Sequence, residues 1–269
     1  MNNIFDFKRF GDYFLYDLRR AKNNYGLSLL LLGCMPVIIF VLFQLIRLIF
    51  IRESVPESDE LKVMITFISI TVAILGAGAK IYGFVTEKRA GSDYLMLPAS
   101  TFEKWLSMVL MVCVVLPVIL FGLMFLSDTL LHWIFPVAYG SRIVDMDFLQ
   151  GISTGLLNLE ETGFYFNFPA VMYLNWCESL LVFTLGAVCF KKAKVAKTLL
   201  CIFAFSMVMS TLMVIFTGNV NITSDFFDRF AEEPVKFVNL FNWVLSIIYT
   251  VVIGGLLAGL YFRLRTLKH

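Results

Sequence analysis

Residues that could do catalytic or metal chemistry are few in this chain and lie far apart in the sequence. The two histidines, His132 and His269, are too few to build a metal site or a histidine-based catalytic triad. The motifs of serine hydrolases, zinc proteases and P-loop nucleotidases do not occur. Gly76-Ala-Gly-Ala-Lys80 comes nearest to a phosphate-binding loop, but its spacing is wrong and it lies inside an apolar run. We therefore expect no catalytic residue, no metal and no cofactor.

Charged side chains inside apolar runs are the second kind of candidate, because proton-coupled transporters use such groups at mid-membrane. Glu178 lies about three turns into an apolar run, and Lys80 lies within about two turns of the end of another. A single glutamate does not make a proton relay, so we interpret Glu178 as a packed or pore-lining polar group, with a proton carrier as the alternative. Lys80 is interpreted as reaching the nearest membrane surface, with contact to a substrate or charged partner as the alternative.

The overall composition indicates that these residues belong to a membrane protein. Of 269 residues, 59% are hydrophobic and 16% are charged, whereas soluble domains average ~45–50% and ~25%. The mean hydropathy of +0.82 agrees with this reading and excludes an ordinary soluble or disordered chain. A net charge of +2 is too small to indicate a nucleic-acid partner.

Six apolar runs are each long enough to cross the ~30 Å hydrocarbon layer as a helix, which takes ~20 residues. They are residues 27–50, 62–85, 104–127, 168–190, 196–217 and 240–262. The runs lack the alternation of a transmembrane barrel, so helices must satisfy their backbone groups. The prediction is an all-α integral membrane protein with one transmembrane domain over 1–269. Pro36 and Pro117 are expected to kink the first and third spans.

Basic residues predict how these helices are oriented. The N-terminal segment, the second-to-third and fourth-to-fifth connections and the C-terminal tail hold fifteen Lys and Arg, against five in the other three connections. Because cytoplasmic loops carry the excess of basic residues, both termini are predicted to be cytoplasmic. The sequence leaves open whether the outer stretches 128–167 and 218–239 form lids or re-entrant helices.

The N-terminal residues 4–22 are predicted to form an amphipathic helix. Phe7, Phe10, Phe14 and Leu18 recur at steps of three and four, which places them on one helical face. Bulky aromatics on one face and cationic residues elsewhere are typical of a helix lying flat in the inner membrane interface. The alternative is a solvated helix that packs on another subunit.

The connection between the second and third spans, residues 86–105, differs from an ordinary loop. Charges cluster at its start, and an apolar turn from Tyr94 to Leu97 runs into Pro98. Ser100 and Glu103 then have the spacing of a capping box, which would start the third span firmly. The pattern predicts a short amphipathic element on the cytoplasmic side, held between two spans and able to transmit force from a soluble partner. The alternative is a basic loop that only reflects the positive-inside bias.

At these residues the chain resembles a known family. Glu87, Arg89 and Gly91, the stretch 95–100 and Lys104 resemble the coupling segment of type-2 permeases of ATP-binding-cassette exporters. The layout of an elbow helix, six spans and two cytoplasmic ends is similar over the whole chain. The start, Phe7 to Gly11, resembles permeases of this group from Bacteroidetes-type bacteria.

The resemblance implies a permease subunit of an exporter in the bacterial inner membrane. Its expected partners are an ATP-binding-cassette ATPase subunit, a second permease copy or paralogue, and the lipid bilayer. The residues expected to couple to the ATPase are Glu87, Arg89, Gly91, Tyr94, Leu97, Pro98, Ser100, Glu103 and Lys104. The competing interpretation is a non-transporting membrane scaffold or assembly factor. The cargo, the direction of transport and the choice between homodimer and heterodimer stay open.

Overall fold

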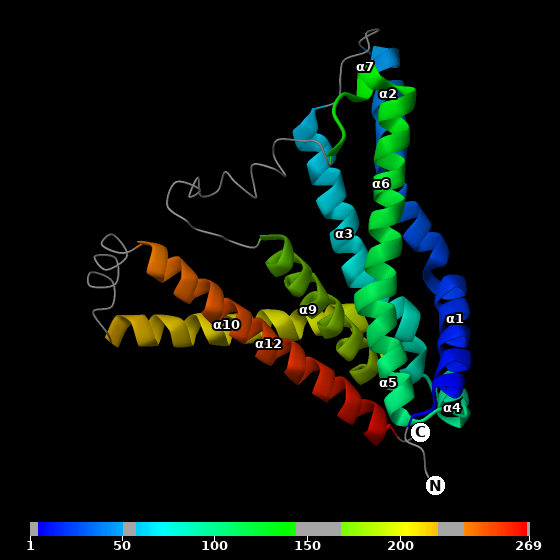
Figure 1. Ribbon diagram of the computed structural model, residues 1–269, viewed down its shortest axis with the longest axis vertical. Helices are drawn as coiled ribbons and strands as arrows, with labels where there is room; N and C mark the ends of the chain where they lie inside the picture. Colours follow the sequence, from blue (N-terminus) through cyan, green and yellow to red (C-terminus); the bar gives the residue numbers. More distant parts are fainter. Residues whose placement is uncertain (1–4, 51–57, 144–167, 220–233, 268–269) are drawn as a thin grey trace.

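The structure is a computed structural model that describes residues 5–50, 58–143, 168–219 and 234–267. Within these ranges every regular element is a helix (Figure 1), which confirms the all-α class. The elements are α1 (Phe7–Gly33), α2 (Met35–Phe50), α3 (Asp59–Tyr82), the 3-10 helix η1 (Gly83–Thr86), α4 (Lys88–Met96), α5 (Thr101–Leu110), the π-helix η2 (Met111–Val115), α6 (Leu116–Ile134), α7 (Pro136–Tyr139), α9 (Phe168–Cys189), α10 (Lys194–Asn219) and α12 (Pro234–Thr266). Most of the two outer stretches, over 144–167 and 220–233, lies outside the described residues.

Several of these helices are suited to crossing a membrane. Within the part of the chain that the structure describes, four helical stretches are long and apolar enough, namely Leu61–Thr86, Thr101–Ile134, Lys194–Ile215 and Trp243–Thr266. A fifth results if α1 and α2 count as one bent span, and Tyr173–Cys189 of α9 is a shorter apolar helix. The chain is therefore consistent with a multi-pass membrane protein.

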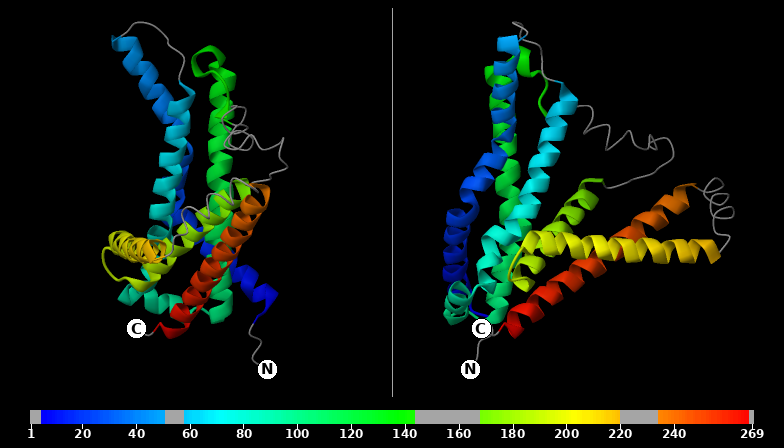
Figure 2. Two further views of the ribbon diagram at one scale, coloured as in Figure 1. Left: turned by 90° about the vertical axis from the view of Figure 1, so that its left-hand side faces the viewer. Right: turned by 180° about the vertical axis from the view of Figure 1, so that it is seen from behind.

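The helices meet at two ends of the molecule (Figure 1). At one end, which we call the α4 end, α1 begins, α4 lies beside it and α12 finishes. At the opposite end, the α7 end, α2 and α7 lie together. Helices α10 and α12 extend sideways from the others in Figure 1 and in the right-hand view of Figure 2, and only 6% of the most apolar part of each is buried. A single chain thus leaves large apolar surfaces of α10 and α12 uncovered.

Helix α1 is longer than the predicted interfacial helix. It continues from Phe7 through Gly33, so the predicted helix 4–22 and the start of the predicted first span form one element. The residues between them contain one weak breaker, Gly26, which costs only ~1 kcal/mol relative to alanine. Next to it, the buried Tyr25 hydroxyl donates a hydrogen bond to the Ala73 carbonyl at 3.1 Å. That contact with α3 favours a continuous helix at this point.

The helix over the predicted first span bends near its proline, as predicted. Helix α1 ends at Gly33, and α2 departs from it at an angle of 47°. The break is at Cys34, two residues before Pro36, whose ring would clash with the carbonyl four residues earlier in a regular helix.

Pro117 has a different effect from the predicted kink. It follows η2, and the stretch Thr101–Ile134 runs on as one helix. Pro117 has no amide hydrogen to donate to the Cys113 carbonyl, which a regular helix would require. The Tyr173 hydroxyl of α9 donates to that carbonyl at 2.8 Å. A π-helical turn and a side chain from α9 together accommodate the proline.

The side of α1 that packs against its neighbours is a stripe with a spacing of four. Its buried members are Tyr13, Asp17, Ala21, Tyr25 and Leu29. The predicted apolar face of α1 lies beside this stripe, and its members are Phe7, Phe10, Phe14 and Leu18. Of these, Phe7 is 83% exposed and the other three are half-buried.

Candidate functional site

Helix α4 is a short element that is separate from both flanking helices. Glu87 precedes it in an extended conformation, and at its other end Leu97 is extended and leads into Pro98. The predicted capping box is present at the start of α5. The Ser100 hydroxyl accepts a hydrogen bond from the Glu103 amide at 3.2 Å, and the Glu103 carboxylate accepts one from the Ser100 amide at 2.8 Å. Both α4 and the following turn therefore have defined local geometry.

One side of α4 is exposed. Arg89, Asp93 and Met96 are spaced four and three apart, so they lie on one side of the helix. Met96 is 82% exposed although it is a large apolar side chain. We call the exposed set formed by Glu87, Arg89, Asp93, Met96 and Pro98 the α4 outer face. Asp93 and Met96 were missing from the predicted set, although their spacing from Arg89 could have identified them.

The opposite side of α4 is buried against the chain's own helices. Gly91 and Tyr94 are buried, and the Tyr94 ring packs edge-on against Phe84 of η1 with centroids 5.7 Å apart. The Arg20 guanidinium of α1 lies over the Phe84 ring, 3.2 Å from its centroid. Burial raises the pKa of the Tyr94 phenol above its ordinary value, so the group stays protonated. Through these rings α4 packs on η1, and η1 in turn contacts α1.

Lys104, which was predicted to couple to a partner, points inward. It is 7% exposed, and its ammonium group donates to the Tyr94 carbonyl at 2.8 Å. The same ammonium lies 5.0 Å from the centroid of the Tyr94 ring. A cation at this position satisfies a carbonyl of the last turn of α4 and complements the helix dipole. Lys104 therefore connects α4 to α5.

The N-terminal side of α4 is connected to the start of α10. The Thr86 hydroxyl donates to the Gly83 and Phe190 carbonyls, at 3.0 and 3.3 Å. The Lys194 ammonium donates to the Gly83 carbonyl and lies 4.0 Å from the Glu87 carboxylate. The turn before α4 is thereby held by residues more than a hundred positions later in the chain.

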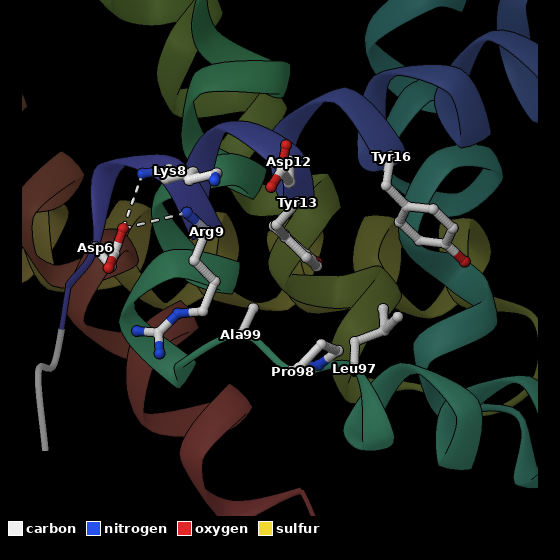
Figure 3. Close-up of a pocket in the computed structure, with 9 residues that line it drawn as sticks. All are labelled: Asp6, Lys8, Arg9, Asp12, Tyr13, Tyr16, Leu97, Pro98 and Ala99. Carbon is white, nitrogen blue, oxygen red and sulfur yellow. Dashed lines mark hydrogen bonds between the residues drawn. The ribbon is translucent and has the colours of Figure 1, made fainter.

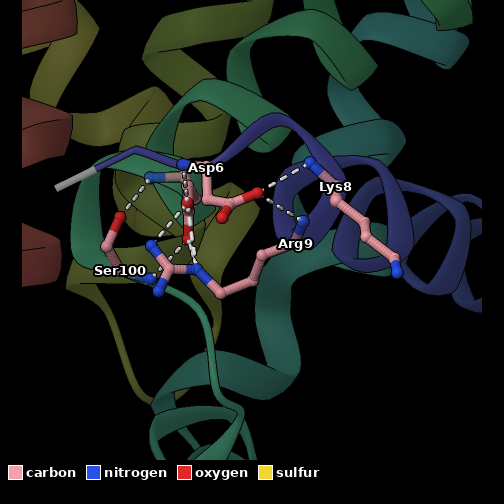
Figure 4. Close-up of polar contacts among 5 residues, drawn as sticks. Asp6, Lys8, Arg9 and Ser100 are labelled. Atoms are coloured by element: carbon pink, nitrogen blue, oxygen red, sulfur yellow. Dashed lines mark hydrogen bonds and ion pairs between the residues drawn. The ribbon is translucent and has the colours of Figure 1, made fainter. Parts of the chain in front are cut away.

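Polar contacts join the start of α1 to the start of α5, and Figure 4 labels Asp6, Arg9 and Ser100 among them. Their shared acceptor is Glu103, whose side chain is fully buried and accepts hydrogen bonds from the Arg9 guanidinium at 2.7 and 2.9 Å. It also accepts from the Asp6 amide at 2.9 Å, besides the capping bond from Ser100. We call Asp6, Arg9, Ser100 and Glu103 the α1–α5 clamp. Glu103, predicted as a coupling residue, is thus occupied by its own chain.

A pocket of about 450 Å³ lies between the first turns of α1 and the loop after α4 (Figure 3). Leu97, Pro98 and Ala99 form one wall, and α1 forms the other. The lining residues from the N-terminal side are Asp6, Lys8, Arg9, Asp12, Tyr13 and Tyr16. Pro98 belongs to both this pocket and the α4 outer face. The two features therefore form one continuous surface that could accept part of another protein.

A buried carboxylate joins three helices near the same end. Asp17 of α1 is 3% exposed and accepts hydrogen bonds from the Tyr82 hydroxyl at 2.8 Å and the Ser107 hydroxyl at 2.7 Å. The three residues come from α1, the end of α3 and α5. Sequence analysis did not single out Asp17, because its partners lie 65 and 90 residues away.

Replacing Asp17 by leucine is expected to lower the free energy of unfolding by about 2 kcal/mol, because two buried hydroxyl groups lose their shared acceptor. The triple variant Asp17→Leu, Tyr82→Phe, Ser107→Ala should recover most of that loss, since it removes the donors as well. Unfolding in mixed detergent micelles, followed by circular dichroism, measures both. Equal destabilisation of the single and triple variants would contradict this account.

The remaining charged candidates take no part in the contacts described above. Glu178 is half-buried in α9 and Lys80 is exposed on α3. Nδ1 of His132 is 2.7 Å from the Gly140 carbonyl at the α7 end. Among the described residues, no group of three or more His, Cys, Asp or Glu side chains could hold a metal ion.

Comparison of the chain with known protein families, with curated proteins and with solved structures gave no match. The class of protein that the described residues define is an all-helical chain with several helices apolar enough to span a membrane.

Proposed function

We propose that this chain is the membrane-spanning permease subunit of an ATP-binding-cassette transporter, an exporter of the bacterial inner membrane. A separate ATPase subunit would bind the α4 outer face and drive the permease. The observation that supports this most is the two-sided character of α4. Its outer face is exposed and carries both charges and a large apolar side chain, whereas its inner side is held by the chain's own helices. Such a helix can receive a partner on one side and transmit its movement on the other.

The contacts of α4 give that movement a physical route. Tyr94 packs on η1 at the end of α3, and Lys104 connects α4 to α5. Lys194 connects the preceding turn to α10. Asp17 and the α1–α5 clamp then join α1 to α3 and α5. Because close-packed interiors are stiff, a displacement of α4 shifts these helices together.

The complete arrangement in this proposal has six spans and both termini in the cytoplasm, with the first half of α1 as the elbow. The distribution of basic residues supports that orientation. The start of α1 and the end of α12 lie at the same end as α4 (Figure 1), which also supports it. The uncovered apolar surfaces of α10 and α12 support a second permease copy or paralogue as a further partner.

Co-purification with candidate ATPases tests the proposal. The native chain should retain an ATP-binding-cassette ATPase and stimulate its ATP hydrolysis. Arg89→Glu and Met96→Asp on the α4 outer face should each reduce ATPase retention about tenfold or more, the size of effect seen at interface hot spots.

Lys192→Glu is the matched control, because Lys192 is an exposed lysine of the α9–α10 connection, outside the α4 outer face. It should retain the ATPase as the native chain does. The proposal is wrong if the native chain retains no ATPase, or if the outer-face variants bind as tightly as the native chain. Retention of other membrane proteins without any ATPase would favour a scaffold or assembly factor.

A further inference from the structure

An apolar groove of about 430 Å³ runs between α1 and the continuous helix η2–α6. Its walls are residues 18–30 of α1 and residues 111–123 of η2–α6, with Ile81 of α3 also lining it. Each wall covers thirteen helical residues, and the twelve steps from the first to the last correspond to a length of about 18 Å. Leu27 and Leu30 are 73% and 50% exposed, so the groove opens to the surroundings of the chain.

Gly26 provides part of the space in the groove. The aliphatic stem of Lys22 lies one turn away, and a Cβ atom at Gly26 would be 3.4 Å from the Lys22 Cγ. On the opposite wall, Met111 and Val115 belong to the π-helical turn η2. Such turns are frequent at functional sites of helical proteins.

The charge of the groove is confined to the end nearer α4. Lys22 is the one charged residue among those that line it, and it is exposed. Arg19, also exposed, lies three residues earlier on α1. The sequence from 18 to 50 contains no Asp or Glu. An apolar slot with a cationic entrance therefore faces outward from α1.

We propose that this groove binds one acyl chain of an anionic phospholipid, with the lipid phosphate at Lys22 and Arg19. The length of about 18 Å compares with ~15 Å for the hydrocarbon of one leaflet. Long cationic side chains at a membrane interface reach the headgroup level while their stems cover apolar surface, as the Lys22 stem does at Gly26. The leaflet is the one at the α4 end. The inference requires that the chain is embedded in a membrane and does not depend on the proposed ATPase.

The charge of the entrance is tested with the full chain in nanodiscs that contain equal amounts of phosphatidylglycerol and phosphatidylcholine. Native mass spectrometry counts the lipids that stay bound. Lys22→Gln should retain about fivefold less phosphatidylglycerol than the native chain, the effect of one basic residue near anionic lipid. Lys191→Gln, at an exposed lysine of the α9–α10 connection and outside the groove, should retain the native amount.

The apolar part of the groove is tested with Gly26→Leu, which fills the space and should reduce retention of both lipids. Gly11→Leu is the matched control, because it makes the same change in the same helix where a Cβ would meet no atom within 4 Å. It should leave retention of both lipids unchanged. Because Lys22 is exposed, Lys22→Gln decides the question by itself if Gly26→Leu fails to fold.

Unchanged phosphatidylglycerol retention in Lys22→Gln would show ordinary boundary lipid and overturn the proposal. So would equal retention of the two lipids by the native chain. Disulfide cross-linking between two copies that carry Leu27→Cys would place a second chain in the groove, which also overturns it. Loss of ATPase binding has no bearing on these outcomes, so failure of the proposed function and failure of the lipid site are distinguishable.

Discussion

Replacing Gly78 by leucine is expected to prevent α9 from packing on α3. A Cβ atom at Gly78 would lie 2.8 Å from backbone atoms of Phe183 and Thr184. A neighbouring side chain could turn aside, but a helix backbone can only move as a whole. Small residues permit this kind of close approach between helices in membranes. We expect the free energy of unfolding to fall by about 3 kcal/mol or more.

The consequence extends beyond one contact, because α9 also packs against α10 and α12. Unfolding in mixed detergent micelles measures the loss. Gly122→Leu is the matched control, since Gly122 also lies in a candidate span and a Cβ there would meet no atom within 4 Å. It should stay within about 0.5 kcal/mol of the native chain. Equal stability of the two variants would mean that α3 and α9 do not cross at Gly78.

The helices themselves could be predicted because an apolar run is a local property. The predicted runs 196–217 and 240–262 correspond to α10 and α12, and the run 168–190 matches α9 almost to the residue. The end of the N-terminal helix could not be predicted in the same way. Its continuation past Gly26 is favoured by the hydrogen bond from the Tyr25 hydroxyl to the Ala73 carbonyl, a residue 48 positions away.

In the candidate site, too, some features follow from neighbouring residues and others depend on residues far away in the sequence. The capping box at Ser100 follows from residues within a few positions of each other, and it was predicted. A short amphipathic element that runs into Pro98 was also predicted, but its bounds as a helix were not. The directions of Glu103 and Lys104 were not predictable locally. Two adjacent charges after a basic loop suggest exposure, yet Glu103 binds Arg9 from 94 residues earlier.

Asp6, Arg9 and Asp17 were not identified as site residues because their partners, too, lie far away in the sequence. In the sequence they are charges of an amphipathic helix, and only the partners from α3 and α5 show that they hold the helices together. A stripe spaced by four, Tyr13 to Leu29, was the one local signal that Asp17 belongs to a packed face. It was less conspicuous than the aromatic series beside it.

Replacing Glu103 by alanine is expected to lower the free energy of unfolding by about 2 to 3 kcal/mol, because the Asp6 amide, the Ser100 amide and the Arg9 guanidinium lose a shared charged acceptor. Glu103→Gln should cost less, since its amide oxygen can still accept from backbone amides. Asp93→Ala is the control, an exposed carboxylate on α4 whose removal should change stability by less than about 0.5 kcal/mol. Unfolding in detergent micelles compares the three variants.

A variant of the α1–α5 clamp can distinguish ATPase binding from the transmission of movement in the proposed transporter. Glu103 lies outside the α4 outer face, so Glu103→Ala should retain the ATPase that Arg89→Glu loses. The variant weakens the connection from α5 to α1, however, so its stimulation of ATP hydrolysis by the ATPase should fall severalfold. Reconstituted complexes permit both measurements at a temperature where the variant is folded. Loss of ATPase retention in folded Glu103→Ala would instead assign the clamp to the docking surface, because the buried carboxylate would then be shaping the face that the partner contacts.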